Sequence, residues 1–128
     1  MSKAVLDASA VLALLNQEPG AQLLTPELLS DATMSTVNLA EVQTKLVRDG
    51  VGPDEAWELA QAPISGAEPF TVEQAKIAGT LVRQTRTLGL SLGDRACLAL
   101  AILLRVPVYT ADKDWKTLKL GVPIHILR

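Results

Sequence analysis

The sequence predicts one α/β domain over residues 1–128, a three-layer α/β/α sandwich with a mainly parallel sheet. Short apolar runs without alternation are followed by segments with helical spacing, an order typical of parallel βαβ units. Apolar residues make up 48% of the 128 residues and charged residues 20%, which is enough apolar material for one closed core. Residues 96–104 are almost wholly apolar, so they predict a helix buried on most sides.

The first half of the chain begins with an apolar run that ends at Asp7. The expected elements are a buried strand at 3–7, a helix at 8–16, helical segments within 20–30, a strand at 32–35 and helices at 38–48 and 53–61. Thr25-Pro26 either opens a second helix within 20–30 or kinks the first, and Pro53 suits a first helical position. Leu39, Val42 and Leu46 share one helix face.

The second half continues the same alternation. The expected elements are a strand at 67–70, one long helix at 71–88, the apolar helix at 94–104 and strands at 106–110 and 124–127. A capping-box pattern at Thr71 and Gln74 opens the long helix, and Gly89 stops it. The sequence contains neither a linker nor a sign of a second domain.

Composition narrows the classes of function. One cysteine, Cys97, excludes an intramolecular disulfide and a cysteine-based zinc site, and one histidine, His125, excludes a His-rich metal site. The net charge of −2 and the 3% aromatic content do not indicate a nucleic-acid surface, which would have to be local. The first apolar stretch is too short to span a bilayer and lacks a charged leader, so we expect a cytoplasmic protein with no membrane partner.

Four acidic residues have unusual positions: Asp7 and Asp112 follow apolar strands, and Glu41 and Asp94 lie near the starts of helices. Strand ends and helix starts share one edge of a parallel sheet, where ligands bind. Four converging carboxylates would repel one another unless a cation neutralised them. Oxygen ligands without nitrogen or sulfur suit Mg²⁺ or Mn²⁺, and such a site can hydrolyse phosphodiesters with metal-activated water.

Each of these residues also has a structural interpretation. Glu41 fits a capping box begun by Asn38, Asp94 fits a partner for a helix dipole, and Asp112 fits a turn. Ser9 could cap the first helix or orient Asp7, and Thr110 could act likewise beside Asp112 or fill a strand position. Asp7 is harder to explain structurally, since a carboxylate that ends a buried strand is costly without a partner.

The four acids lie in four segments of characteristic sequence and order. The segments are Val5-Leu6-Asp7-Ala8-Ser9-Ala10, Asn38-Leu39-Ala40-Glu41-Val42, Leu90-Ser91-Leu92-Gly93-Asp94-Arg95-Ala96-Cys97-Leu98-Ala99 and Val106-Pro107-Val108-Tyr109-Thr110-Ala111-Asp112. In these segments and their order, the chain resembles the PIN-domain ribonucleases, and among them the VapC-type toxins of toxin–antitoxin pairs. The resemblance covers the whole chain. It implies a PIN-like fold and a metal-dependent endoribonuclease, with Asp7, Glu41, Asp94 and Asp112 as catalytic metal ligands for Mg²⁺ or Mn²⁺, supported by Ser9 and Thr110.

The same resemblance implies three partners: an RNA substrate, a cognate antitoxin protein and a second copy of the chain in a homodimer. Basic residues that could form a rim for RNA are Lys45, Arg48, Arg83, Arg86, Arg95, Lys113, Lys116 and Lys119. Two other classes of function stay open at this point. One is a Mg²⁺-binding phosphate-receiver-like signalling domain, and the other is a non-catalytic binding module whose acids are helix caps.

Overall fold

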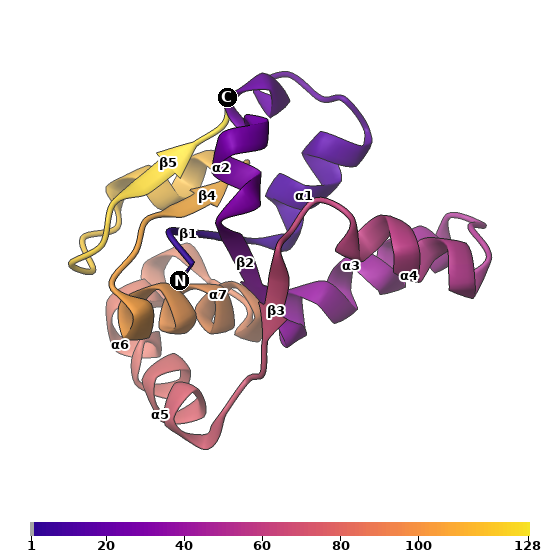
Figure 1. Cartoon of the computed structure of the whole chain (residues 1–128). Coiled ribbons are helices and arrows are strands. Elements are labelled where there is room, and N and C mark those ends of the chain that lie inside the picture. Colours follow the sequence, from indigo (N-terminus) through magenta and orange to yellow (C-terminus); the bar gives the residue numbers. More distant parts are fainter. Residues whose placement is uncertain (1) are drawn as a thin grey trace.

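A computed structural model describes residues 2–128 and contains one five-stranded sheet (Figure 1). The strands are β1 (Ala4–Leu6), β2 (Ala32–Ser35), β3 (Gly66–Glu68), β4 (Val108–Thr110) and β5 (Ile124–Ile126). Their order is β3-β2-β1-β4-β5 and every pairing is parallel. This order differs from the 2-1-3-4-5 order of the flavodoxin-like receiver domains, so the fold does not support the receiver-like alternative.

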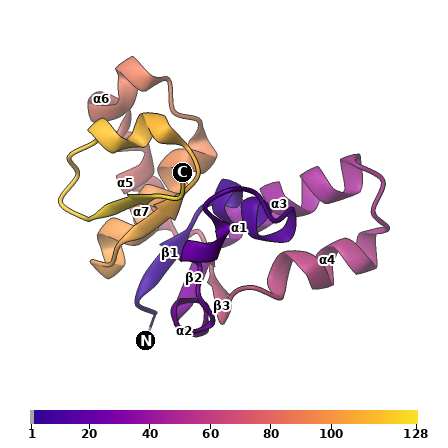
Figure 2. The same ribbon diagram turned by 90° about the horizontal axis from the view of Figure 1, so that it is seen from above.

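Helices cover both faces of this sheet (Figures 1 and 2). They are α1 (Ala8–Leu15), α2 (Pro26–Ser30), α3 (Thr36–Arg48), α4 (Pro53–Gln61), α5 (Val72–Thr80), α6 (Val82–Thr85) and α7 (Leu92–Leu104), with 3-10 turns η1 (Ala21–Leu23), η2 (Arg86–Leu88) and η3 (Lys113–Thr117). Figure 2 shows α3 and α4 as a hairpin that extends away from the sheet. Among the described residues, no helix has both the length and the apolar character needed to cross a membrane.

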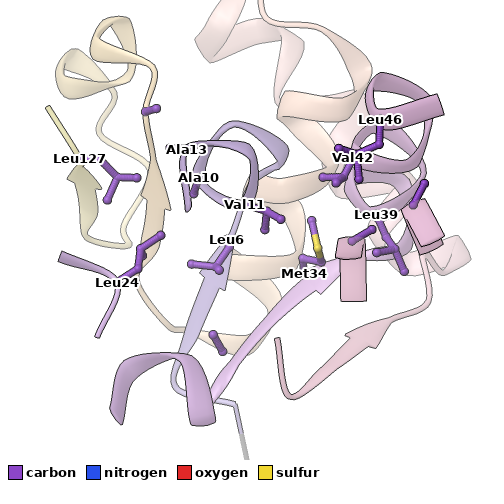
Figure 3. Close-up of a cluster of buried hydrophobic side chains, with 14 residues drawn as sticks. Leu6, Ala10, Val11, Ala13, Leu24, Met34, Leu39, Val42, Leu46 and Leu127 are labelled. Carbon is purple, nitrogen blue, oxygen red and sulfur yellow. The ribbon is translucent and has the colours of Figure 1, made fainter. Parts of the chain in front are cut away.

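Successive residues of β1 enter opposite cores, as the two-residue period of a strand requires. Leu6 packs in a cluster with Val11, Met34 and Val42 (Figure 3), between the sheet and α1, α3 and α4. Val5 packs on the other face, in a cluster that includes Leu98 and other residues of α7. Two cores separated by one sheet confirm the predicted three-layer sandwich.

Most predicted elements are confirmed, and their boundaries differ for local reasons. The helix expected at 38–48 begins at Thr36 because the Ser35 side chain accepts a hydrogen bond from the amide of Val37 and caps it. The strand expected at 67–70 ends at Glu68, since Pro69 has no N–H to donate to the ladder. Thr25-Pro26 opens a second helix, α2, and does not kink the first.

The prediction of one long helix at 71–88 is wrong. Thr71 caps α5 as expected, but the helix stops at Thr80 and the chain continues through α6 and η2 to Gly89. Leu81 at the break is buried in the α7-side core, and its carbonyl accepts a hydrogen bond from the buried Thr85 hydroxyl. The interruption of the helix thus coincides with a side chain, Leu81, that is buried in the same core as Leu98 of α7.

Candidate active site

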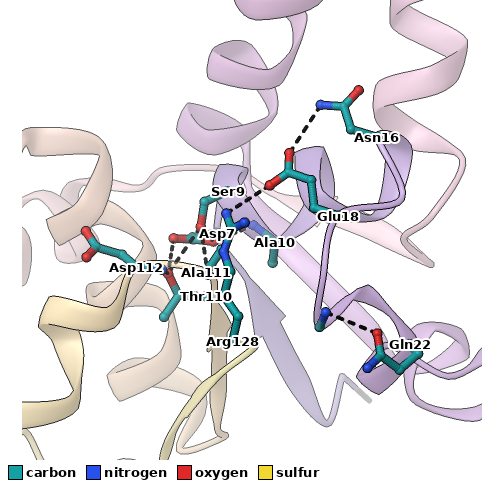
Figure 4. A network of polar contacts seen from close by, with 11 residues as sticks. Asp7, Ser9, Ala10, Asn16, Glu18, Gln22, Thr110, Ala111, Asp112 and Arg128 are labelled. Carbon is teal, nitrogen blue, oxygen red and sulfur yellow. Dashed lines mark hydrogen bonds and ion pairs between the residues drawn. The ribbon is translucent and has the colours of Figure 1, made fainter.

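Asp7 follows β1 and caps the N-terminus of α1 (Figure 4). Its side chain is only 4% exposed. Oδ1 accepts hydrogen bonds from the Ser9 hydroxyl at 2.7 Å and from the Ala10 amide at 2.8 Å, and Oδ2 accepts one from the Thr110 hydroxyl at 2.6 Å. The cap of α1 is therefore Asp7, and the capping role considered for Ser9 is wrong.

Thr110 reaches Asp7 because β1 and β4 are neighbours, with Leu6 paired to Tyr109. The hydroxyl groups of Ser9 and Thr110 also accept hydrogen bonds from backbone amides of the turn after β4. Ser9 Oγ accepts from the Ala111 amide at 2.9 Å, and Thr110 Oγ1 accepts from the Asp112 amide at 3.1 Å. We call Asp7, Ser9 and Thr110 the hydroxyl network; it joins the ends of two strands that lie about a hundred residues apart in sequence.

Burial raises the pKa of Asp7 from its usual 3.8 to about 6. Removal from water disfavours the charged carboxylate. The hydrogen bonds from Thr110, Ser9 and Ala10 act in the opposite direction, and the nearby charge of Asp94 raises the pKa further. Desolvation is the largest of these effects, so Asp7 carries a proton at mildly acidic pH.

Glu41 lies in the second turn of α3, where its side chain is exposed. Its Oε1 accepts a hydrogen bond from Asn38 Nδ2 at 2.7 Å. The same Nδ2 donates to the carbonyl oxygen of Gly93 in α7 at 3.0 Å. Asn38 is therefore turned inward and does not cap α3, which corrects the capping box considered for Asn38 and Glu41.

Asp94 and Asp112 each accept a hydrogen bond from a nearby backbone amide. Asp94 completes a capping box with Ser91 at the start of α7: its Oδ2 accepts from the Ser91 amide at 3.0 Å, and Ser91 Oγ accepts from the Asp94 amide at 3.1 Å. Asp112 caps η3, where its Oδ1 accepts from the Asp114 amide at 3.0 Å. Both carboxylates are partly exposed, so rotation about the side-chain bonds can release them from these caps.

The structure brings three of the four predicted acids around one buried side chain. Burial raises the pKa of the Cys97 thiol, and the charges of Asp7, Asp94 and Glu41 raise it further. Asp112 joins this group indirectly, through the hydrogen bond of its amide to Thr110. In residues 2–128 no three Asp, Glu, His or Cys side chains are spaced to hold one metal ion with their present rotamers.

The chemistry of these side chains fits a hard divalent cation. The donors are carboxylate oxygens, the ligands that Mg²⁺ and Mn²⁺ prefer. Within the described part of the chain, none of the four acids forms an ion pair with a basic side chain. The negative charge of Asp94 therefore raises the pKa of Asp7, and no basic side chain in an ion pair with either residue offsets this repulsion.

A groove of about 450 Å³ lies along α3 beside Glu41 and is bordered by Thr44, Lys45 and Arg48. Lys45 also pairs with Asp49 at 3.3 Å on the solvent-exposed side of the helix. Arg95, another expected member of a basic rim, is partly buried and donates to the carbonyl oxygen of Ala78 at 2.9 Å. Arg95 therefore links α7 to α5, whereas Lys45 and Arg48 border the groove beside Glu41.

Sequence reasoning did not assign a role in the site to Asn38 or Gly93. A Cβ atom added at Gly93 would lie 2.3 Å from Glu41 Oε2 and 2.6 Å from Glu41 Cδ. Asn38 is 1% exposed, although asparagine is usually exposed. Its position three residues before Glu41 was the only available signal, and that spacing fits a capping box equally well.

A family model of the PIN domain matches residues 4–120. The match covers most of the chain, which therefore belongs to the PIN domain family. A comparison with curated proteins found no match.

Solved structures share the fold at low sequence identity. The VapBC complex bound to DNA from Salmonella typhimurium superposes with a TM-score of 0.76 at 14% identity, covering 100% of both chains. A toxin–antitoxin complex from Klebsiella pneumoniae gives 0.74 at 19% identity, covering 94% of this chain and 95% of that chain. VapC20 from Mycobacterium tuberculosis, described as a sarcin-ricin loop cleaving toxin, gives 0.70 at 18% identity, covering 94% and 99%.

Proposed function

We propose that this PIN domain chain is a divalent-metal-dependent endoribonuclease and the toxin of a VapBC-type toxin–antitoxin pair. The observation that carries the proposal is the buried Asp7, which has three hydrogen-bond donors and the charge of Asp94 nearby. Burying a carboxylate costs more free energy than a helix cap alone would justify, and strongly shifted pKa values are typical of functional sites. Among the similar structures are toxins in complex with antitoxins, and one is described as cleaving the sarcin-ricin loop.

Asp7, Glu41, Asp94 and Asp112 would hold Mg²⁺ or Mn²⁺ in this proposal. The bound cation would acidify water and stabilise negative charge on the attacked phosphate. Ser9 and Thr110 hold the Asp7 carboxylate in place, and their short hydrogen bonds leave it little freedom to rotate. The Asp94 and Asp112 carboxylates would turn from their helix caps toward the cation.

Purified protein incubated with total RNA, with and without Mn²⁺ or Mg²⁺, tests this activity. We expect new 5′ ends that require the metal and disappear with EDTA. Asp94→Asn should reduce cleavage at least about 100-fold, whereas Asp54→Asn should not. Both residues are acids in the first turn of a helix, so Asp54 controls for the loss of a helix-dipole interaction. Equal activity of the two variants, or cleavage that persists in EDTA, contradicts the proposal. A parent protein that cleaves no RNA with either metal favours a non-catalytic binding module.

Binding of the RNA backbone would use basic residues beside the acids. Arg48 borders the groove next to Glu41 and is exposed. If Arg48 contacts one phosphate, Arg48→Gln should reduce the salt dependence of RNA binding by about one unit of slope. Arg105→Gln, at the opposite end of α7 from Asp94, is the matched control and should leave the slope unchanged.

Two protein partners are part of the proposal: a second copy of the chain and a cognate antitoxin. Large apolar side chains are exposed on several elements, among them Leu23 of η1, which supports more than one protein contact. On α3 and α4 they are Val47, Trp57 and Leu59, and around α5 to α7 they are Val72, Val82, Leu92, Leu103 and Leu104. Light scattering should give the mass of a dimer at micromolar concentration, and a monomer would contradict this part. We propose a cytoplasmic location, where an RNA substrate would be available.

A further inference from the structure

One buried amide joins the starts of α3 and α7. Asn38 is 1% exposed, and its Nδ2 donates both to Glu41 Oε1 and to the carbonyl oxygen of Gly93. Since both partners are acceptors, the orientation of the amide is fixed, because a flipped amide would place its oxygen against two other oxygens. Within residues 2–128, Asn38 Oδ1 is buried without a hydrogen-bond partner. A buried acceptor without a partner reduces the stability of the fold, so the two hydrogen bonds donated by Nδ2 must offset this cost.

Gly93 forms the other side of the same contact. With an added Cβ atom, residue 93 would approach within 2.3–2.7 Å of all three atoms of the Glu41 carboxylate group. Gly93 is not among the glycines with positive φ, so any residue could adopt its backbone conformation. A larger residue here would displace the Glu41 carboxylate, which packs directly against the α7 backbone.

We propose that Asn38 and Gly93 form a clamp that holds the Glu41 carboxylate against the first turn of α7, beside Asp94, and that Asn38 is a positioning residue of the metal site. The clamp rests on the proposed function only in that Glu41 serves as a metal ligand. Glu41 is otherwise exposed, and a free glutamate side chain samples many rotamers. Fixing it before the cation arrives removes this entropy cost from metal binding.

The contact can be tested without metal or RNA. Asn16 and Asn38 are the only asparagines of the chain, so ¹⁵N-asparagine labelling gives two side-chain amide groups in an NMR spectrum. Asn16 is exposed and serves as the internal reference. We expect the Asn38 amide protons to exchange slowly with D₂O and to shift in Glu41→Ala and in Gly93→Ala. Unchanged Asn38 resonances in both variants would overturn the clamp.

Gly93→Ala is the sharpest variant because alanine favours a helix more than glycine, and the group that it displaces is the end of a flexible side chain. Gly79→Ala in α5 is the matched control, since a Cβ atom there meets nothing within 4 Å. Loss of outer contacts to a metal ligand typically weakens metal binding 10–100-fold. We expect Gly93→Ala to weaken Mn²⁺ binding by this factor, measured from the electron paramagnetic resonance signal of free Mn²⁺, and Gly79→Ala to bind as the parent.

A double-mutant comparison separates positioning from a general structural role. In a Glu41→Ala background the displaced carboxylate is absent, so Gly93→Ala and Asn38→Leu should weaken Mn²⁺ binding no further. The same losses in both backgrounds would overturn the clamp, as would parental Mn²⁺ affinity in Gly93→Ala. A parent protein that binds no Mn²⁺ would overturn the role in the metal site and the proposed function together, while the NMR result would still decide whether Asn38 and Gly93 hold Glu41.

Discussion

Asp7 and Asp94 carry the same functional group, but the fold places them in opposite surroundings. Asp7 is 4% exposed and receives three hydrogen bonds, two of them from side chains. Asp94 lies at the surface end of α7, where its side chain accepts from one backbone amide. Burial raises the pKa of Asp7 to about 6. The carboxylate at the strand end is therefore held rigidly at a cost in stability, whereas the carboxylate at the helix start stabilises its helix and is free to turn.

This difference suggests that the proposed site combines one rigid ligand with ligands that can move. The hydroxyl network fixes one ligand in the position that the sheet dictates, and it cannot relax when the site is empty. Asp94 and Asp112, which only cap helix starts, can adjust to a cation after it arrives.

Metal binding should stabilise the protein, and Asp7 should be required for it. At a hundredfold excess of Mn²⁺ over its dissociation constant, mass action gives about 2.7 kcal/mol of added stability. Asp7→Asn should show a much smaller gain in thermal melts with and without the metal, because it loses the fixed ligand. Asp54→Asn should gain as much as the parent. If Mn²⁺ stabilised Asp7→Asn as much as the parent, Asp7 would not be a ligand of the cation.

The raised pKa of Asp7 predicts how stability depends on pH in EDTA. The folded state binds the proton more tightly than the unfolded state, so this contribution is fully present below about pH 3.8 and is lost as pH rises through about 6. The pKa difference corresponds to roughly 2–3 kcal/mol between pH 4 and pH 7. Denaturant unfolding should show this loss in the parent but not in Asp7→Asn, which should be as stable as the parent or up to about 2 kcal/mol more stable at pH 7. A variant far less stable than the parent at pH 7 would show that Asp7 is a structural acceptor.

Thr110→Val should destabilise the protein by about 2 kcal/mol at pH 7. It keeps the shape of the buried side chain but removes the donor to the Asp7 carboxylate and the acceptor for the Asp112 amide, and hydrogen bonds to charged groups contribute more than neutral ones. The loss should be smaller at pH 4, where Asp7 is protonated. A loss that is the same at both pH values would mean that the hydroxyl serves the backbone turn and not the Asp7 charge.

Ser91→Ala should cost only about 1 kcal/mol, the usual effect of losing a helix cap. Ser91 is exposed and its partners are within the first turn of α7, so the loss should be the same at pH 5 and pH 8. The measurement is denaturant unfolding at the two pH values. A loss above about 2 kcal/mol would show that the helix start is as tightly coupled to the core as the hydroxyl network.

Local patterns in the sequence were sufficient to predict the three-layer fold class and the type of most elements. Strands and helices differ in hydrophobic period, and that period is a local property. The cap that Thr71 makes before α5 was also visible in the sequence, whereas Thr25-Pro26 left open whether α2 begins there. The position of Asp7 at the end of a buried run was enough to single it out, because an acid there needs a partner wherever the strand lies.

The hydrogen-bond partners of the site residues depend on tertiary packing and could not be predicted from the sequence. The neighbouring positions of β1 and β4 bring Thr110 to Asp7, and the packing of α3 on α7 brings Asn38 and Glu41 to Gly93. The interruption of the helix at Leu81 also lies at a tertiary contact, since Leu81 is buried in the same core as residues of α7. These contacts join residues that are distant in sequence. Their free energies depend on distance and burial in the folded chain, which no local pattern encodes.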